Sequence, residues 1–243
     1  MKRTVLRLLA LGTVFGFAAH GGVIGNWSGS LRSWNNSDMS TLKAAMIGAG
    51  NTVLADSAIT AGNLAGDNVF VIGEALSSPT AAEGTALANF VNGGGILLVL
   101  FDSGCSGCVG GNAALADVGS TMSASGANPV VAPFPGGIFA TTGPPFNLVG
   151  QTLDTSPGSA IAGGIDIAGT YVAYQHIGSG FVFAFADRSD HNTFSPDNTH
   201  TNGKLFLNIV GSAAVVATPE PATGWLIGAG MGMLALGLRK RSR

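Results

Sequence analysis

Residues 68–101 read NVFVIGEALSSPTAAEGTALANFVNGGGILLVLF, and this stretch decides the expected fold. Two stretches, 68–72 and 96–101, carry unbroken apolar runs (69–72 in the first), which are typical of strands that are buried on both faces of a parallel sheet. The segment between them opens with a capping-box pair, Thr80 and Glu83, and closes with three glycines, as an α-helix does. Strand, helix and strand in this order predict a βαβ unit with a parallel sheet.

The segments on either side extend the same pattern of strands and helices. Apolar residues at helical spacing predict helices at 38–50, 112–122 and 202–214. Short apolar runs predict strands at 51–59, 129–133, 171–175 and 181–186, and the last two are joined by a hairpin turn across 177–180. Residues 134–168 are rich in Gly, Pro and Thr and are expected to form loops and small hairpins. The sequence therefore predicts one α/β domain with a mainly parallel sheet and flanking helices.

Parts of this domain resemble a known family. The segments 69–73, 87–95 and 98–100 are similar to class I glutamine-amidotransferase-like domains, in which a helix ending in F-V-x-x-G-G joins two strands. Residues 183–187 and 205–209 resemble the closing strand and helix. The resemblance covers roughly residues 50–125 and 170–214 and implies a flavodoxin-like sheet. Because many unrelated activities share such a fold, it implies no particular reaction.

Composition and charge exclude several classes of protein. Of 243 residues, 46% are hydrophobic and only 10% are charged, which argues against intrinsic disorder. Seven of the 11 basic residues lie within the first seven or last five positions. Between residues 21 and 218 there remain 4 basic and 12 acidic residues, a net charge of −8. A body this acidic repels phosphate backbones, so we expect no nucleic-acid partner.

The N-terminus predicts a secretory signal peptide over residues 1–19. Three basic residues, Lys2, Arg3 and Arg7, precede the apolar core 8–19. This core is short for a membrane span, which favours a cleaved signal over the alternative of an N-terminal anchor. The exported domain is then expected over residues 20–217.

The C-terminus predicts a second address, over residues 218–243. Pro219-Glu220-Pro221 is followed by the apolar run 222–238, 17 residues long, and by the basic tail 239–243. The run is at the lower limit for a transmembrane helix, and the basic tail favours a cytoplasmic end. The alternative is a permanent tail anchor.

The order of these C-terminal parts resembles the PEP-CTERM sorting signal of Gram-negative bacteria. The resemblance implies recognition by an exosortase, a membrane-embedded cysteine transpeptidase, and cleavage near residues 219–221. The precursor is then expected in the inner membrane and the mature protein at the cell surface or in the extracellular matrix. Proteins with this signal are similar to cargo of bacteria that make exopolysaccharide, biofilm or flocs, so exopolysaccharide is the expected partner.

Acidic residues follow three of the predicted strands, and open parallel sheets bind ligands at the carboxyl ends of their strands. We expect them to lie at one rim, where they could form an acid/base pair or a cation site: Glu74, Asp102 and Asp187, joined by Asp190, His191, Asp197 or His200. The alternative is that these side chains cap helices and stabilise turns, as Asp commonly does. Trp27 and Trp34 have two interpretations as well, a sugar-binding aromatic platform or part of the core.

The chain has two cysteines, Cys105 and Cys108, directly after the predicted strand 96–101. The interpretation favoured by export is a local disulfide. A C-x-x-C redox pair and a nucleophilic cysteine are the alternatives. No His-x-Glu pair follows His176, which argues against an amidotransferase triad. Zinc would need two further ligands, so no metal or cofactor is predicted.

Together these features predict an exported, sorted protein of the cell surface or matrix that is associated with exopolysaccharide and is not an enzyme. The alternative is a hydrolase or ligand-binding protein with an amidotransferase-like fold and an acidic site at the carboxyl ends of its strands.

Overall fold

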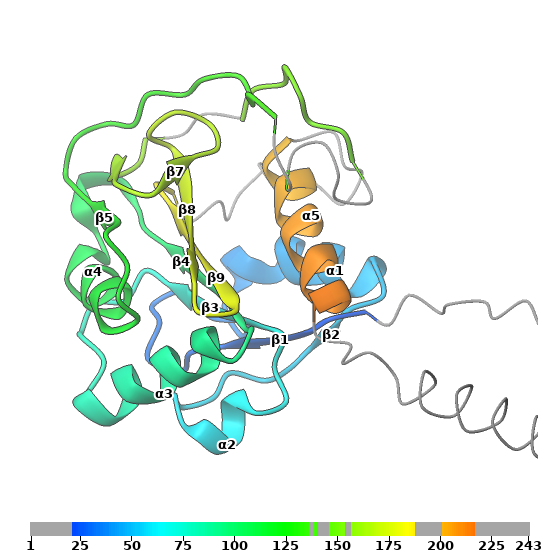
Figure 1. Cartoon of the computed structure of the whole chain (residues 1–243), viewed down its shortest axis with the longest axis vertical. Helices are drawn as coiled ribbons and strands as arrows, with labels where there is room; N and C mark the ends of the chain where they lie inside the picture. Colours follow the sequence, from blue (N-terminus) through cyan, green and yellow to red (C-terminus); the bar gives the residue numbers. More distant parts are fainter. Residues whose placement is uncertain (1–20, 137–138, 140–145, 154–156, 188–200, 217–243) are drawn as a thin grey trace, which may run out of the picture.

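The computed structural model describes residues 21–136, 139, 146–153, 157–187 and 201–216 (Figure 1). Within them the main sheet has seven strands in the order β2-β1-β3-β4-β9-β8-β7. Their bounds are β1 Val23–Asn26, β2 Thr52–Val53, β3 Val69–Gly73, β4 Ile96–Leu100, β7 Ile165–Asp166, β8 Val172–Ile177 and β9 Gly180–Phe185. A separate two-stranded sheet pairs β5 (Ser123–Ala124) with β6 (Ile161–Ala162).

Helices cover both faces of the main sheet (Figure 1). On one face α1 contacts α5, and on the other α3 contacts both α2 and α4. The α-helices are α1 Ser40–Gly48, α2 Ala61–Leu64, α3 Ala81–Asn92, α4 Cys108–Asp117 and α5 Thr201–Val216, and the 3₁₀ turns are η1 Ser37–Met39 and η2 Ser103–Cys105. The described part of the chain is therefore a mixed α/β structure with a large, mostly parallel sheet.

The predicted βαβ unit is present. Strands β3 and β4 are fully buried, pair in parallel and are joined by α3. Thr80 Oγ1 accepts from the Glu83 amide at 3.3 Å, and a Glu83 carboxylate oxygen accepts from the Thr80 amide at 2.8 Å. This capping box starts α3 where the sequence predicts it, because two otherwise unpaired amides at the start of the helix gain acceptors.

The predicted hairpin is also present. Strands β8 and β9 pair antiparallel, and β9 pairs in parallel with β4. Consequently β3, β4 and β9 run in the same direction, and their carboxyl ends meet at one edge of the sheet. Strand β1 runs in parallel with β3 on its other side and ends at that edge too.

Two local predictions are wrong, and one strand was not predicted. Helix α4 begins at Cys108 instead of residue 112, because Gly107 takes a left-handed conformation (φ 78°) that turns the chain into the helix directly after the cysteines. Residues 129–133 form no strand, since Pro129 and Pro133 lack the amide hydrogens that a ladder needs. Strand β1 was not predicted, because its four residues contain a glycine and a buried asparagine.

A buried asparagine on α5 joins this helix to the loop that covers β8 and β9. The Asn208 amide donates to the carbonyl oxygens of Phe139 and Phe146 at 2.8 and 2.9 Å, and its oxygen accepts from the Phe146 amide at 3.1 Å. The ring of Phe139 then packs edge-on against Tyr174 and Phe183, with centroids 5.3 and 4.7 Å apart. Asn208 therefore fixes an aromatic cover over this part of the sheet.

Neither address segment falls within the described residues. The predicted signal peptide 1–19, the apolar run 222–238 and the basic tail 239–243 all lie outside them. Among the residues that the structure describes, no helix is long and apolar enough to cross a membrane.

Candidate functional site

The structure places the three predicted acidic residues at the same edge of the sheet. Gly73, Leu100 and Phe185 are direct neighbours across β3, β4 and β9. The ladder continues one residue further, since the Glu74 amide donates to Leu100 O at 2.8 Å. Glu74, Asp102 and Asp187 thus follow three adjacent strands, but each carboxylate is engaged by a different set of groups.

Glu74 is held by the protein on both carboxylate oxygens. Arg32 Nε donates to one oxygen at 2.9 Å, and the Ser106 hydroxyl donates to the other. The residue is 3% exposed and its backbone is in the left-handed region, with φ of 52°. Gly107 allows this geometry, because a Cβ there would lie 2.7 Å from the Cα of Glu74. Glu74 therefore links the loop after β1 to the cysteine loop after β4.

The loop after β1, residues 27–32, lies at the carboxyl ends of β1 and β3. Open α/β sheets bind ligands at such a point, where the direction of winding changes. The chain leaves β1 first toward β2 and then returns to add β3 on the other side, so the direction of winding changes between β1 and β3. There the Trp27 amide donates to Val71 O at 3.0 Å and the Arg32 amide to Gly73 O at 3.1 Å. The Ser30 hydroxyl accepts from the Gly73 amide at 3.0 Å. Residues 27–32 thus run along the end of β3 and pair with it.

Asp102 organises the cysteine loop. Its carboxylate accepts from the Ser103 amide at 2.6 Å and caps the short turn η2. Its carbonyl oxygen accepts from the Ser159 hydroxyl, which in turn accepts from the Cys105 amide at 2.9 Å. These contacts are those of a capping and turn-forming residue.

Cys105 and Cys108 are joined by a disulfide, with Cα atoms 5.0 Å apart. The bond closes the loop that begins at Asp102 and leads directly into α4. In this state neither sulfur is a thiolate, which is the form that a nucleophile requires.

Asp187 is buried at the end of β9. The hydroxyl of Tyr171, a fully buried residue, donates to its carboxylate at 3.3 Å. The other residues predicted to join this rim, His191 among them, lie outside the described residues. Within the part that the structure describes, no group of three or more His, Cys, Asp or Glu side chains is arranged to hold a metal ion.

Trp27 and Trp34 form no exposed platform, since they are 5% and 2% exposed. They belong to the core, which was the second interpretation of these residues.

Four residues that hold the rim together were not singled out from the sequence: Arg32, Ser106, Ser159 and Tyr171. Only Arg32 had a usable signal, because it is one of four basic residues in an acidic body and a buried carboxylate needs a cation. The serines and the tyrosine contact partners that are distant in the sequence, and no local pattern marks them.

The comparisons with known proteins identify the C-terminal segment. Residues 217–242 match the family model described as the PEP-CTERM protein-sorting motif. The chain carries a sorting signal for exosortase. No curated protein matches the chain.

Solved structures are similar to the domain in fold. The mmIFT52 N-terminal domain is 14% identical with a TM-score of 0.61, over 82% of this chain and 98% of that one. A cytoplasmic protein from Salmonella typhimurium LT2 is 14% identical with a TM-score of 0.56, over 79% and 98%. A second cytoplasmic protein from Salmonella typhimurium is 11% identical with a TM-score of 0.52, over 78% and 97%. At such identities the likeness concerns the fold alone.

Proposed function

We propose that the chain is the precursor of a non-enzymatic protein of the cell surface or extracellular matrix that associates with exopolysaccharide. In this proposal residues 1–19 direct export, residues 222–238 hold the precursor in the inner membrane, and exosortase cleaves near Pro219-Glu220-Pro221. The exported domain, residues 20–217, then acts outside the cell. The observation that carries the proposal is the sorting motif at residues 217–242.

The geometry of the rim supports a non-catalytic domain. A general acid or base must reach a proton of the substrate within hydrogen-bond distance. Glu74, the most buried of the three carboxylates, instead has an ion pair with Arg32 and a hydrogen bond from Ser106. The chain's own loop 27–32 pairs with the end of β3 at the switch point of the sheet. These contacts favour a structural role for the rim.

The second candidate function is that of a hydrolase or ligand-binding protein with a flavodoxin-like, amidotransferase-like fold and an acidic site at the rim. One observation favours it: Glu74 and Cys105 have positive φ, 52° and 64°, and both lie at the carboxyl ends of the strands. Strained backbone gathers at functional sites. In this alternative Asp102, Asp187 and His191 would complete the site.

A variant of the sorting motif tests the proposal. Replacing Pro219-Glu220-Pro221 by three alanines is expected to leave the protein in the inner membrane at precursor mass, whereas the parent protein is found outside the cell at lower mass. The matched control replaces Asp166 by alanine, which removes one exposed carboxylate of β7 and leaves the motif intact. Release of the triple-alanine variant at the same rate as the parent would contradict the proposal.

A further inference from the structure

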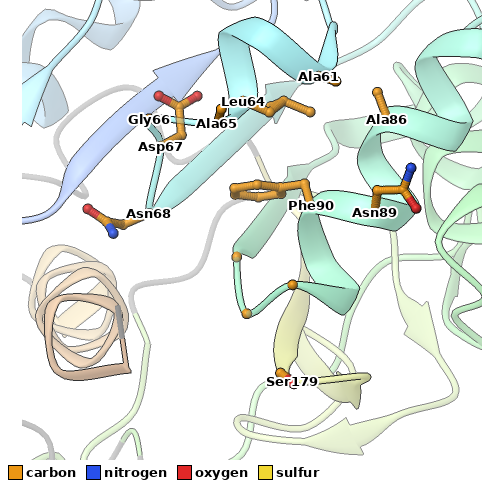
Figure 2. Close-up of a pocket in the computed structure, with 13 residues that line it drawn as sticks. Ala61, Leu64, Ala65, Gly66, Asp67, Asn68, Ala86, Asn89, Phe90 and Ser179 are labelled. Carbon is orange, nitrogen blue, oxygen red and sulfur yellow. The ribbon is translucent and has the colours of Figure 1, made fainter. Parts of the chain in front are cut away.

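A cavity of about 540 Å³ lies at the opposite edge of the sheet from the carboxylate rim. It lies between α2 and α3, beside the residues that lead into β3 and β4 and the turn that joins β8 to β9 (Figure 2). Its volume is within the range of about 300–1,000 Å³ that is usual for small-molecule sites. None of the rim residues lines it, so it is a separate site.

One wall of the cavity is apolar and contains an aromatic ring. Figure 2 shows the ring of Phe90 extending from α3 into the space below Leu64. The ring is half-buried, and it rests on Gly95, where a Cβ would lie 2.4 Å from the ring. The absence of a side chain at Gly95 thus makes room for the ring. Three alanines continue the apolar wall: Ala61, Ala65 and Ala86.

The remaining lining is polar but contains no cation. Asn89 and Ser179 are exposed at the mouth of the cavity, and Asn68 and Asp67 are half-buried in its wall. The Asn68 oxygen accepts from the Val23 amide at 2.8 Å, so its NH₂ group is the end that can donate to a ligand. Burial raises the pKa of Asp67 to about 6.

This lining selects among ligand classes. A phosphorylated or carboxylated ligand would have no basic partner among the residues that line the cavity. A wholly apolar ligand would displace water from the half-buried Asn68 amide without replacing its hydrogen bonds. A sugar ring carries no charge and matches both the apolar and the polar lining. Its C–H face packs on an aromatic ring, and its hydroxyl groups both donate and accept hydrogen bonds. We infer that the cavity between α2 and α3 binds a neutral saccharide unit, with Phe90 as the stacking surface and Asn89, Asn68 and Ser179 as hydrogen-bonding groups.

This inference deepens the proposed function and rests on it only for the source of the ligand, an exopolysaccharide outside the cell. The protein purified from its own cells, in the form those cells make, is titrated with neutral hexoses, N-acetylhexosamines and oligosaccharides released from their exopolysaccharide. Binding is followed by NMR shifts and calorimetry. We expect saturable binding of at least one neutral sugar, and binding of its 6-phosphate weaker by about tenfold or more, because no cation lines the cavity.

Variants locate the binding. Phe90→Ala is expected to weaken it by about tenfold and Asn89→Ala by a few-fold. Asn89 is exposed, so its replacement is expected to leave the fold intact. Asn89→Ala therefore tests the site even if Phe90→Ala fails to fold. Thr85→Ala is the control, because it removes an exposed polar side chain of α3 that does not line the cavity.

Two results would overturn the inference: no neutral sugar binds, or the sugar binds equally well to the parent, Phe90→Ala and Asn89→Ala. The proposed function is judged separately by where the parent protein is found. If it is in the matrix but binds no sugar through this cavity, only the inference fails. If it stays in the inner membrane at precursor mass, the proposed function fails whatever the titration shows.

Discussion

The replacement of Asp67 by asparagine is expected to stabilise the protein at neutral pH. Asp67 directly precedes Asn68 and β3, and its carboxylate lies against Gly25 of β1, where a Cβ would be 2.2 Å from one carboxylate oxygen. Its other oxygen, Oδ1, is buried without a hydrogen-bond partner within the described structure. Burial therefore raises the pKa of Asp67 from 3.8 to about 6.

The direction of the pH dependence follows from the protonation state of Asp67 that the folded protein favours. The raised pKa means that folding favours the protonated acid, so the contribution of Asp67 is fully present below about pH 4 and is lost as the pH rises through about 6. A difference of this size corresponds to about 3 kcal/mol for a fully buried group. Because Asp67 is only half-buried, solvent screening reduces the expected effect to about 1 kcal/mol. Asparagine carries no charge and avoids this loss.

The assay is urea unfolding of the parent and Asp67→Asn at about pH 4 and about pH 7.5. The free energies of unfolding should agree within error at the lower pH, and the variant should be more stable by about 1 kcal/mol at the higher pH. Asp166→Asn is the matched control, because it removes one exposed carboxylate of β7. If Asp67→Asn is no more stable than the parent at the higher pH, or gains equally at both, the account of Asp67 is wrong.

Three further substitutions test the contacts that hold the fold and the rim. Asn208→Ala removes three hydrogen bonds of a fully buried side chain and should lower the free energy of unfolding by about 2–4 kcal/mol. A loss below about 1 kcal/mol would contradict the view that Asn208 fixes the aromatic cover over the sheet. Thr80→Ala should lower it by about 1 kcal/mol through loss of the capping box, while Thr80→Ser should retain most of the stability. Arg32→Ala leaves the Glu74 carboxylate without its ion pair and should lower the free energy of unfolding by about 2 kcal/mol. The double variant Arg32→Ala/Glu74→Gln should recover part of this loss, because it also removes the buried charge. Equal stability of the single and the double variant would count against the ion pair.

The central part of the fold was predictable because its signals are local. The buried runs that became β3 and β4, and the capping pair Thr80 and Glu83, each specify structure within a few residues. The β8–β9 hairpin followed from two apolar runs on either side of a glycine-containing turn. Strand β1 was missed because its pairing with β3 depends on contacts that are distant in the sequence.

The edge of the sheet where the acidic residues meet was also predictable, since parallel strands share a carboxyl edge. What these residues do there was not. The partners of Glu74 come from two different loops, and the partner of Asp187 is Tyr171, at the start of the hairpin. The cavity beside Phe90 had no sequence signal, because the phenylalanine reads as part of the apolar face of a helix and Gly95 as part of its stop.

The measurement that tests the central claim most directly is the intact mass of the native protein in each cell fraction. The account predicts a mature form outside the cell that lacks both residues 1–19 and the segment after the Pro219-Glu220-Pro221 motif. A chain of full precursor mass found only in the membrane would contradict it. The domain would then be a tethered one, and its rim around Glu74 and Asp187 would become the first place to look for chemistry.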